Sequence, residues 1–219
     1  MSFSAYGGRD YVCGILRQIR LSKIFFPDWS VRVYLNSSVP RDIVDMVKRE
    51  AQVVEIPSDS PFINSGMFWR LMIAEDEDVD VYCIRDSDSI FNYRESIAVE
   101  QWLSSGKGFN TMHDHLYHTG YIVGCCWCGR RRIKNMNQKM LQWKHREKWG
   151  DDQDFLNSQI WPIMKNDVVV YDTCESRRKR NYEIPFPTER IACEFVGIAY
   201  RKGINIWNYY PYLCYPKKT

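Results

Sequence analysis

Two aspartates separated by a single residue stand at the end of an apolar run in this sequence. The segment YCIRDSDSIF covers residues 82–91 and contains Asp86 and Asp88. Two carboxylates at this spacing, after an extended segment, can turn toward one hard cation, which can in turn hold a diphosphate. Asp and Ser are also common turn and N-cap residues. The spacing alone therefore indicates either a metal clamp for a phosphorylated ligand or an ordinary polar turn.

The elements before this pair predict where it lies in the fold. Apolar and alternating patterns predict strands at residues 2–6, 30–36, 52–56 and 79–84. Helical patterns separate these strands, at residues 10–25, 40–50 and 66–76. Strands that alternate with helices predict a parallel sheet covered by helices. Ligands of such sheets bind beyond the carboxyl ends of the strands, which is where Asp86 and Asp88 are expected.

The second part of the chain continues the same α/β pattern without a domain boundary, so we predict a single domain. Helices are expected at 93–105, around 130–147 and at 151–164, and strands at 108–112, 121–127 and 168–172. The segment 121–127 contains a glycine and can also be a close-packed turn. Asp152 shares the inward row of the last helix with Leu156 and Ile160, so it is either a cap or a catalytic group. Asp154 is the second candidate.

Composition excludes several classes of protein. The 219 residues include 30 basic and 27 acidic ones, a net charge of +3, which is too balanced for a protein that coats nucleic acid. The basic runs at 129–132 and 176–180 are interpreted as solvated surface, with nucleic-acid contacts or a lid over a leaving diphosphate as alternatives. The sequence shows no apolar run of membrane-spanning length and no secretory leader, so we expect a cytoplasmic protein without a membrane span.

Cysteine and histidine spacing gives no strong metal motif. The eight cysteines include no CxxC pair, and we expect free thiols in a reducing compartment. The CCWC cluster at 125–128 lacks a second pair of ligands, and the histidines of HDHLYH at 113–118 are spaced for no closed zinc site. We predict that neither segment by itself binds zinc.

Two rival interpretations of the aspartate pair differ in their fit. An EF-hand loop is excluded, because its fifth, sixth and twelfth positions hold Ile90, Phe91 and Ile97. A haloacid-dehalogenase-type phosphatase would use Asp86 as nucleophile, and GDDQD at 150–154 resembles its last acidic motif. Its aspartate pair normally follows the first strand, however, whereas three strands precede the pair here. The phosphatase stays an alternative, as does a non-catalytic nucleic-acid-binding module.

Three segments together resemble a known family. They are MFWRLMIAEDEDVDVYCIRDSDS (67–89), NYRESIAVEQWLSSGKGFNTMHDHLYHTGYIVGCCWCGRR (92–131) and DDQDFLN (151–157). In this order they are similar to motifs of nucleotide-sugar-dependent glycosyltransferases of the GT-A fold, over roughly residues 2–172. The likeness is greatest to the compact catalytic domains of large algal (chlorella-type) DNA viruses, which would place the protein in the host cytoplasm.

The resemblance implies a fold and an activity. It implies a Rossmann-like, mostly parallel central sheet flanked by helices, with a nucleotide-binding part at about 1–90 and an acceptor and sugar part at about 91–219. The implied enzyme transfers a hexose from a nucleoside diphosphate sugar, expected to be UDP-linked, to a glycan hydroxyl. Mn²⁺ or Mg²⁺ is the implied cofactor. The partners are the sugar donor and the glycan acceptor, with no nucleic acid.

The resemblance also implies roles for individual residues. Asp88 is the expected main metal ligand, and Asp86 is shared between the metal and the ribose. Because no histidine follows His145, water, phosphate oxygens or an earlier histidine would complete the metal shell. Asp152 or Asp154 would act as general base in an inverting reaction or steady the transition state in a retaining one. The expected contacts to the nucleotide and donor sugar come from Tyr6, Gly7, Arg9, Arg70, Asp86, Ser87, Asp114, His115 and Gly124.

The sequence around Arg70 also predicts a partner for this residue. It lies on an otherwise apolar predicted helix, where an unpaired charge is costly, so Asp86 is its expected partner. The alternative is an exposed arginine on the polar side of that helix.

Overall fold

The computed structural model describes residues 1–63, 65–144, 148–173, 183–191, 194–201 and 204–205. The sheet strands are β1 (Ser2–Ala5), β2 (Arg32–Leu35), β3 (Gln52–Glu55), β4 (Tyr82–Arg85), β5 (Phe109–His113), β6 (Trp127–Gly129), β7 (Val168–Asp172) and β8 (Glu183–Pro185). The helices are α1 (Arg9–Phe25), α2 (Arg41–Lys48), the 3₁₀ helix η1 (Gly66–Glu75), α3 (Tyr93–Ser104), α4 (Met136–Gln142), α5 (Asp151–Phe155), the π-helical η2 (Leu156–Ile160) and α6 (Trp161–Met164). A separate hairpin joins β9 (Tyr200–Arg201) to β10 (Ile204–Asn205).

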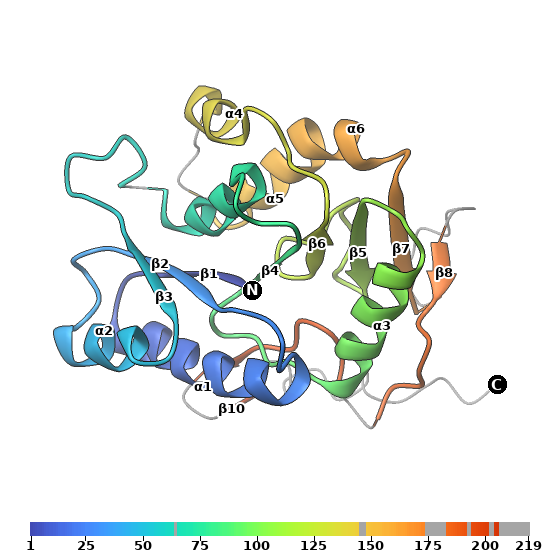
Figure 1. Cartoon of the computed structure of the whole chain (residues 1–219), viewed down its shortest axis with the longest axis horizontal. Helices are drawn as coiled ribbons and strands as arrows, with labels where there is room; N and C mark the ends of the chain where they lie inside the picture. The colour runs from blue at the N-terminus through green and yellow to red at the C-terminus, as the bar shows by residue number, and fades with distance from the viewer. Residues whose placement is uncertain (64, 145–147, 174–182, 192–193, 202–203, 206–219) are drawn as a thin grey trace.

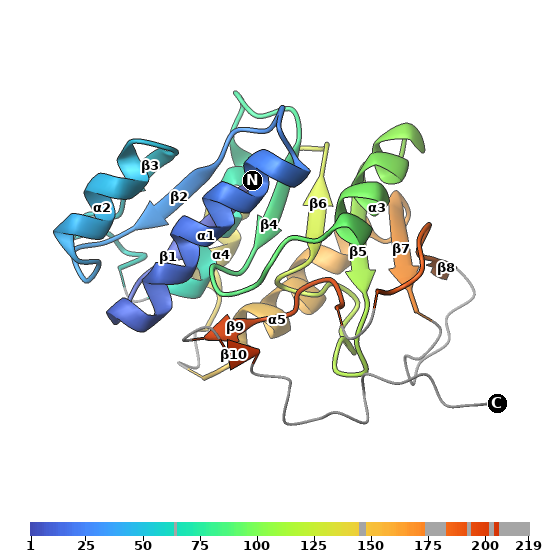
Figure 2. The ribbon, with the colours of Figure 1, turned by 90° about the horizontal axis from the view of Figure 1, so that it is seen from below.

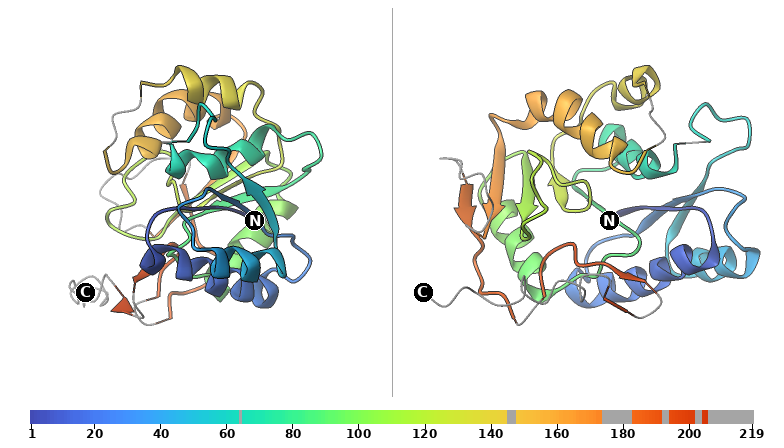
Figure 3. Two further views of the ribbon diagram at one scale, coloured as in Figure 1. Left: turned by 90° about the vertical axis from the view of Figure 1, so that its left-hand side faces the viewer. Right: turned by 180° about the vertical axis from the view of Figure 1, so that it is seen from behind.

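One sheet runs through the molecule, in the order β3-β2-β1-β4-β6-β5-β7-β8. β6 is antiparallel to both of its neighbours, and every other pairing in this sheet is parallel. Helices α1, α2 and α3 cover one face, and η1, α4, α5 and α6 cover the other (Figures 1 and 3). The predicted α/β fold with a mostly parallel sheet is confirmed.

Each helical layer packs its own apolar stripe on the sheet. α2 begins directly after Pro40, whose missing N–H needs no partner there, and buries Ile43, Val44 and Val47. On the other face Phe155, Leu156 and Ile160 pack with residues of η1 and α4. Within the described residues, no helix has the length and apolar character needed to cross a bilayer.

Local structure departs from the predicted elements mainly in the second part of the chain. Residues 121–127, predicted as a strand or a close-packed turn, form a turn up to the last residue, where β6 begins, and the Gly124 N–H donates to the side chain of Gln153. The helix expected around 130–147 is confined to α4, while residues 145–147 lie outside the described part. The helix predicted at 151–164 forms as α5, η2 and α6, and its widened turn precedes Pro162, which lacks the N–H of a regular α-helix.

The prediction that the cysteines are free thiols is wrong for two of them. Cys83 on β4 and Cys128 on β6 are directly opposed in an antiparallel pair and form a disulfide. Cys13, Cys125 and Cys126 are free. The pairing escaped prediction because 45 residues separate the two cysteines, and only the strand register brings them together.

Candidate active site

The Asp86–Asp88 turn lies where the strand order of the sheet reverses. β1 pairs with β2 on one side and with β4 on the other, all in parallel. The carboxyl ends of β1 and β4 therefore meet at one edge of the sheet, with Tyr6 and Gly7 after β1 and Asp86 after β4. This point of an open parallel sheet is the usual place of a nucleotide.

Side chains of helix α1 donate hydrogen bonds to the Asp86–Asp88 turn. The Gln18 side-chain amide donates to the Asp86 carbonyl at 3.1 Å and to Ser89 Oγ at 2.9 Å, and Arg17 Nη2 donates to the Asp88 carbonyl at 3.2 Å. A Cβ on Gly14 would collide with the Ser87 backbone. These contacts were not predicted, although a glycine and a buried glutamine on the apolar face of a helix are a signal for a close polar contact.

Gly14→Ala tests whether α1 sets the position of the turn. Alanine alone would favour the helix, but its methyl group must displace the Ser87 backbone, so we expect a net loss of about 1–3 kcal/mol in unfolding free energy. Urea unfolding measures this loss. Gly8→Ala is the control, because its Cβ would meet nothing within 4 Å; since Gly8 is the N-cap of α1, alanine there should cost less than about 1 kcal/mol. Equal values for the two variants would show that the close contact does not matter.

Arg70 joins the turn to the helix that begins at Asp151. It is buried, its Nη1 pairs with Asp86 Oδ1, and its Nη2 donates to Asp152 Oδ2 at 2.7 Å. The predicted Arg70–Asp86 contact is thus present. Burial disfavours the charged guanidinium, but Asp86 and Asp152 outweigh this effect and raise the pKa of Arg70. Burial also raises the pKa of Asp152, against the opposing charge of Arg70.

The Gly124 turn lies against this ion-paired cluster. A Cβ on Gly124 would stand 3.3 Å from Asp152 Oδ2 and 3.6 Å from Arg70 Nη2, so glycine allows the backbone to approach the pair. Gln153 Oε1 accepts from the Gly124 N–H at 2.9 Å, and Gln153 Nε2 donates to the Ile122 carbonyl. Asn157 Oδ1 accepts from the Ile122 N–H at 3.1 Å. Sequence reasoning missed the roles of Gln153 and Asn157, whose partners lie 29 to 35 residues away in the sequence.

Asp154, the other predicted catalytic residue, lies on a different side of the helix. Two residues along a helix correspond to a rotation of about 200°. Its Oδ2 pairs with Lys148 Nζ at 2.7 Å, and both side chains are nearly half exposed. The structure therefore brings Asp152, and not Asp154, to the Asp86–Arg70 cluster.

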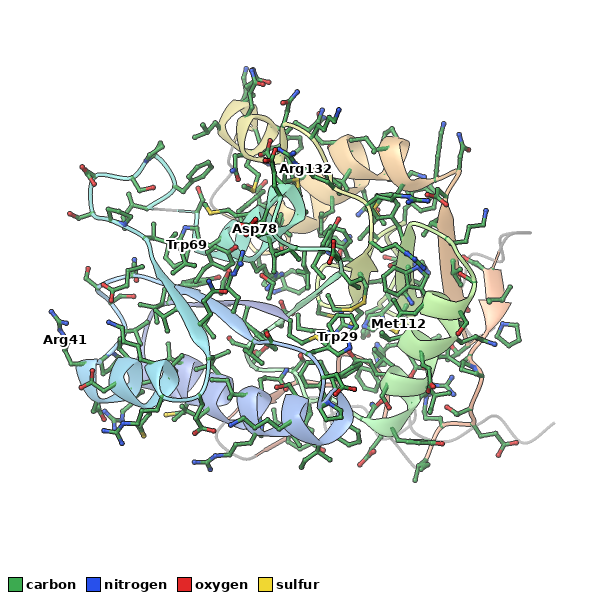
Figure 4. The ribbon with its side chains drawn as sticks, viewed as in Figure 1. Trp29, Arg41, Trp69, Asp78, Met112 and Arg132 are labelled. Carbon is green, nitrogen blue, oxygen red and sulfur yellow. A yellow bond between two sulfur atoms is a disulfide. The ribbon has the colours of Figure 1, made fainter. Side chains whose placement is uncertain are left out.

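Tyr6, Gly7 and Arg9, which follow β1, lie in different environments. Tyr6 packs edge-on against Trp69 of η1, with ring centroids 5.6 Å apart (Figure 4 labels Trp69). Gly7 has a φ of +81°, a conformation that glycine adopts without strain. Arg9 pairs with Asp42 of α2 at 2.6 Å on the surface.

Within the described part of the chain, Asp114 accepts hydrogen bonds from residues that are distant in the sequence. It is fully buried, and its carboxylate accepts from Arg94 Nε at 2.9 Å, from Arg190 Nη2 at 3.1 Å and from the Val196 N–H at 2.9 Å. Arg94 Nη2 is a fourth donor, at 3.1 Å. The buried carboxylate thus connects Arg190 and Val196 to the sheet, and contact of Asp114 with a donor sugar stays a prediction.

The histidines of the HDHLYH loop face different partners. His115 stacks on Phe195, with centroids 4.4 Å apart, and burial lowers the pKa of His115 to about 4. His118 Nδ1 accepts from the Asp114 N–H at 3.1 Å. His113 instead approaches Asp172 at the end of β7. The three histidines therefore have different partners.

The C-terminal segment completes the surroundings of the aspartate turn. The Tyr200 N–H donates to the Asp88 carbonyl at 2.8 Å, and the Ile90 N–H donates to the Ile198 carbonyl at 2.9 Å. Figure 2 shows β9 beside α1, at the edge of the sheet where the turn lies. The Asp88 carbonyl therefore accepts from the Arg17 side chain of α1 and from the Tyr200 backbone N–H.

The basic run 129–132 is engaged at the surface. Arg130 donates to the Leu103 carbonyl at 2.9 Å, Arg131 pairs with Asp167 at 3.5 Å, and Arg132 pairs with Glu77 (Arg132 is labelled in Figure 4). These partners agree with a solvated surface. The second run, 176–180, lies outside the described residues.

The solved structures that resemble this fold include a galactosyltransferase. One is the galactosyltransferase LgtC in complex with donor and acceptor sugar analogues, which matches with a TM-score of 0.51 at 14% identity, over 78% of this chain and 72% of that one. Another is residues 1–349 of TarS from S. aureus, with a TM-score of 0.48 at 13% identity, over 84% of this chain and 60% of that one. No family sequence model and no curated protein sequence matches the chain. The chain thus has the GT-A fold, and the viral resemblance stays a prediction.

Proposed function

We propose that this protein is a metal-dependent glycosyltransferase that passes a hexose from a UDP-linked donor to a glycan hydroxyl. One observation carries the proposal: Asp86 and Asp88 stand at the strand reversal of a GT-A sheet, with Arg70 linking Asp86 to Asp152. A nucleotide would bind in the part formed by residues 1–90. The sugar and acceptor would bind in the remainder.

The residues present fit a hard divalent cation. Carboxylate oxygens are the ligands that Mg²⁺ and Mn²⁺ prefer. Arg70 contacts Oδ1 of Asp86, and the side chain of Asp86 is 38% exposed, so its second oxygen can reach a ligand. Asp88, held by α1 and the C-terminal segment, would supply the other carboxylate. A cation bound there would neutralise negative charge on a leaving diphosphate.

The protein groups around this position have separable tasks. Arg70 orients both Asp86 and Asp152, because it pairs with each through a different nitrogen. Gly124 lets the backbone approach the same space. Asp152, whose pKa is raised by burial, is nearer to the range of a useful general base than an exposed aspartate. In an inverting reaction its carboxylate would take the proton of the acceptor hydroxyl, and in a retaining reaction it would stabilise positive charge on the sugar.

Calorimetric titration with UDP, with and without Mn²⁺, tests the proposal. We expect UDP to bind in the presence of Mn²⁺ and much more weakly without it. UDP release from UDP-hexoses in the presence of glycan acceptors then identifies the sugar. Absence of UDP binding under both conditions, with other nucleoside diphosphates equally inert, would contradict the proposal.

An assay of phosphate-monoester hydrolysis with the same protein distinguishes the proposed glycosyltransferase from the phosphatase alternative. That enzyme would hydrolyse a phosphate monoester such as p-nitrophenyl phosphate through a phospho-aspartate at Asp86. The structure favours the transferase, because Asp86 follows the fourth strand in sequence and is already paired with Arg70. Monoester hydrolysis that is lost in Asp86→Asn would reverse this preference.

A further inference from the structure

Three metal-ligating side chains meet on one face of the sheet, away from the strand reversal. His113 ends β5, Asp172 ends β7 and Glu183 begins β8, and these strands are adjacent and parallel (Figure 1). His113 is in register with Asp172, and Glu183 is in register with Val170, two residues before Asp172. Since side chains alternate along a strand, all three point to the same face.

The separations between these side chains are those of ligands around an ion. His113 Nδ1 lies 3.7 Å from Asp172 Oδ2 and 4.0 Å from Glu183 Oε1, and the three atoms lie within 4.8 Å of one another. Both separations are too long for a hydrogen bond. Ligands at about 2.0–2.2 Å from a tetrahedral ion are roughly 3.4 Å apart, so a small closure would place all three in contact with one ion.

The far nitrogen of His113 is already oriented as in a metal ligand. Nε2 lies 3.3 Å from the Tyr121 carbonyl oxygen, and since a carbonyl only accepts, Nε2 carries the hydrogen. In the neutral ring, Nδ1 then directs a lone pair at the two carboxylates. A backbone carbonyl on the other nitrogen is the common support of a metal-bound histidine.

The three side chains are shielded from solvent. The side chains of His113, Asp172 and Glu183 are only 2%, 3% and 8% exposed. Where solvent has little access, a bound cation attracts carboxylate oxygens and an imidazole nitrogen more strongly than it would at the surface.

We propose that His113, Asp172 and Glu183 bind a divalent transition-metal ion, with zinc as the best match to one nitrogen and two carboxylate ligands. This site is distinct from Asp86 and Asp88. It connects the end of β5, where the loop that carries Gly124 begins, to β7 and β8. The bound ion stabilises this edge of the sheet, with solvent as the fourth ligand.

Metal analysis of the full chain tests the site. After treatment with EDTA, the protein is titrated with Zn²⁺, and with Co²⁺ as a spectroscopic substitute whose visible absorption reports four-coordinate binding. We expect one tightly bound ion per chain and a melting temperature that rises with Zn²⁺. In Glu183→Gln and in His113→Gln, affinity should fall by at least about tenfold. Asp167→Asn, a change at the other end of β7, should bind like the wild type.

Two results would overturn the site. One is absence of tight Zn²⁺ or Co²⁺ binding by the wild-type protein. The other is unchanged binding in both variants, which would indicate adventitious metal elsewhere. Asp88→Asn should keep the Zn²⁺ site, and Glu183→Gln should keep Mn²⁺-dependent UDP binding, so each proposal can fail without the other.

Discussion

Replacing Asp88 with asparagine is expected to abolish turnover of the sugar donor while the protein stays folded. Asparagine keeps the shape of the side chain but removes the negative charge that would hold the cation under the diphosphate. Loss of such an electrostatic contact costs about 3 kcal/mol of transition-state stabilisation or more, which is a rate decrease of at least about 100-fold. The measurement is UDP release under saturating Mn²⁺, with Mn²⁺-dependent UDP binding followed by calorimetry.

Asp80→Asn is the matched control for this variant. Asp80 is exposed and precedes β4, whereas Asp88 follows the same strand, so the substitution removes the same charge at the opposite edge of the sheet. It should leave both turnover and UDP binding unchanged. If Asp88→Asn retained full activity at an unchanged melting temperature, the assignment of the metal to this turn would be wrong.

Local patterns were sufficient to predict the first half of the fold. The four strands and their helices follow from apolar periodicities within each segment, and the chain order places Asp86 at the end of β4. The Arg70–Asp86 contact was predicted for a similar reason, since a charge on an apolar helix needs a partner near the adjoining strand. Only the type of helix differed, because η1 is a tight 3₁₀ helix along its length.

The parts that were not predicted depend on the order and register of strands far apart in the sequence. The Cys83–Cys128 disulfide requires β6 to insert antiparallel between β4 and β5. The approach of His113 to Asp172 requires β7 to pair in register with β5. Neither arrangement leaves a periodic signal in its own segment. The ion pairs of Asp114 with Arg94 and Arg190 were not predicted either, because these partners are distant in the chain.

Arg70→Met is expected to produce the largest loss of stability among these variants. Arg70 is buried and is the common partner of Asp86 and Asp152. Methionine fills much of the same volume but leaves the two carboxylates near each other without the guanidinium. Removing one member of a buried ionic cluster typically costs about 3–5 kcal/mol, because an uncompensated charge stays in the protein. Urea unfolding at neutral pH measures the loss.

Arg132→Met provides the comparison, because its pair with Glu77 is largely exposed and should contribute less than about 1 kcal/mol.

The pH dependence identifies the cause of the Arg70→Met loss. Burial already raises the pKa of Asp152, and removal of Arg70 takes away the charge that opposes this shift. A carboxyl whose pKa is higher in the folded than in the unfolded protein gains stability as the pH falls toward the folded value. The deficit of Arg70→Met relative to the wild type should therefore shrink on acidification from neutral pH, and a deficit independent of pH would indicate lost packing instead of unpaired charge.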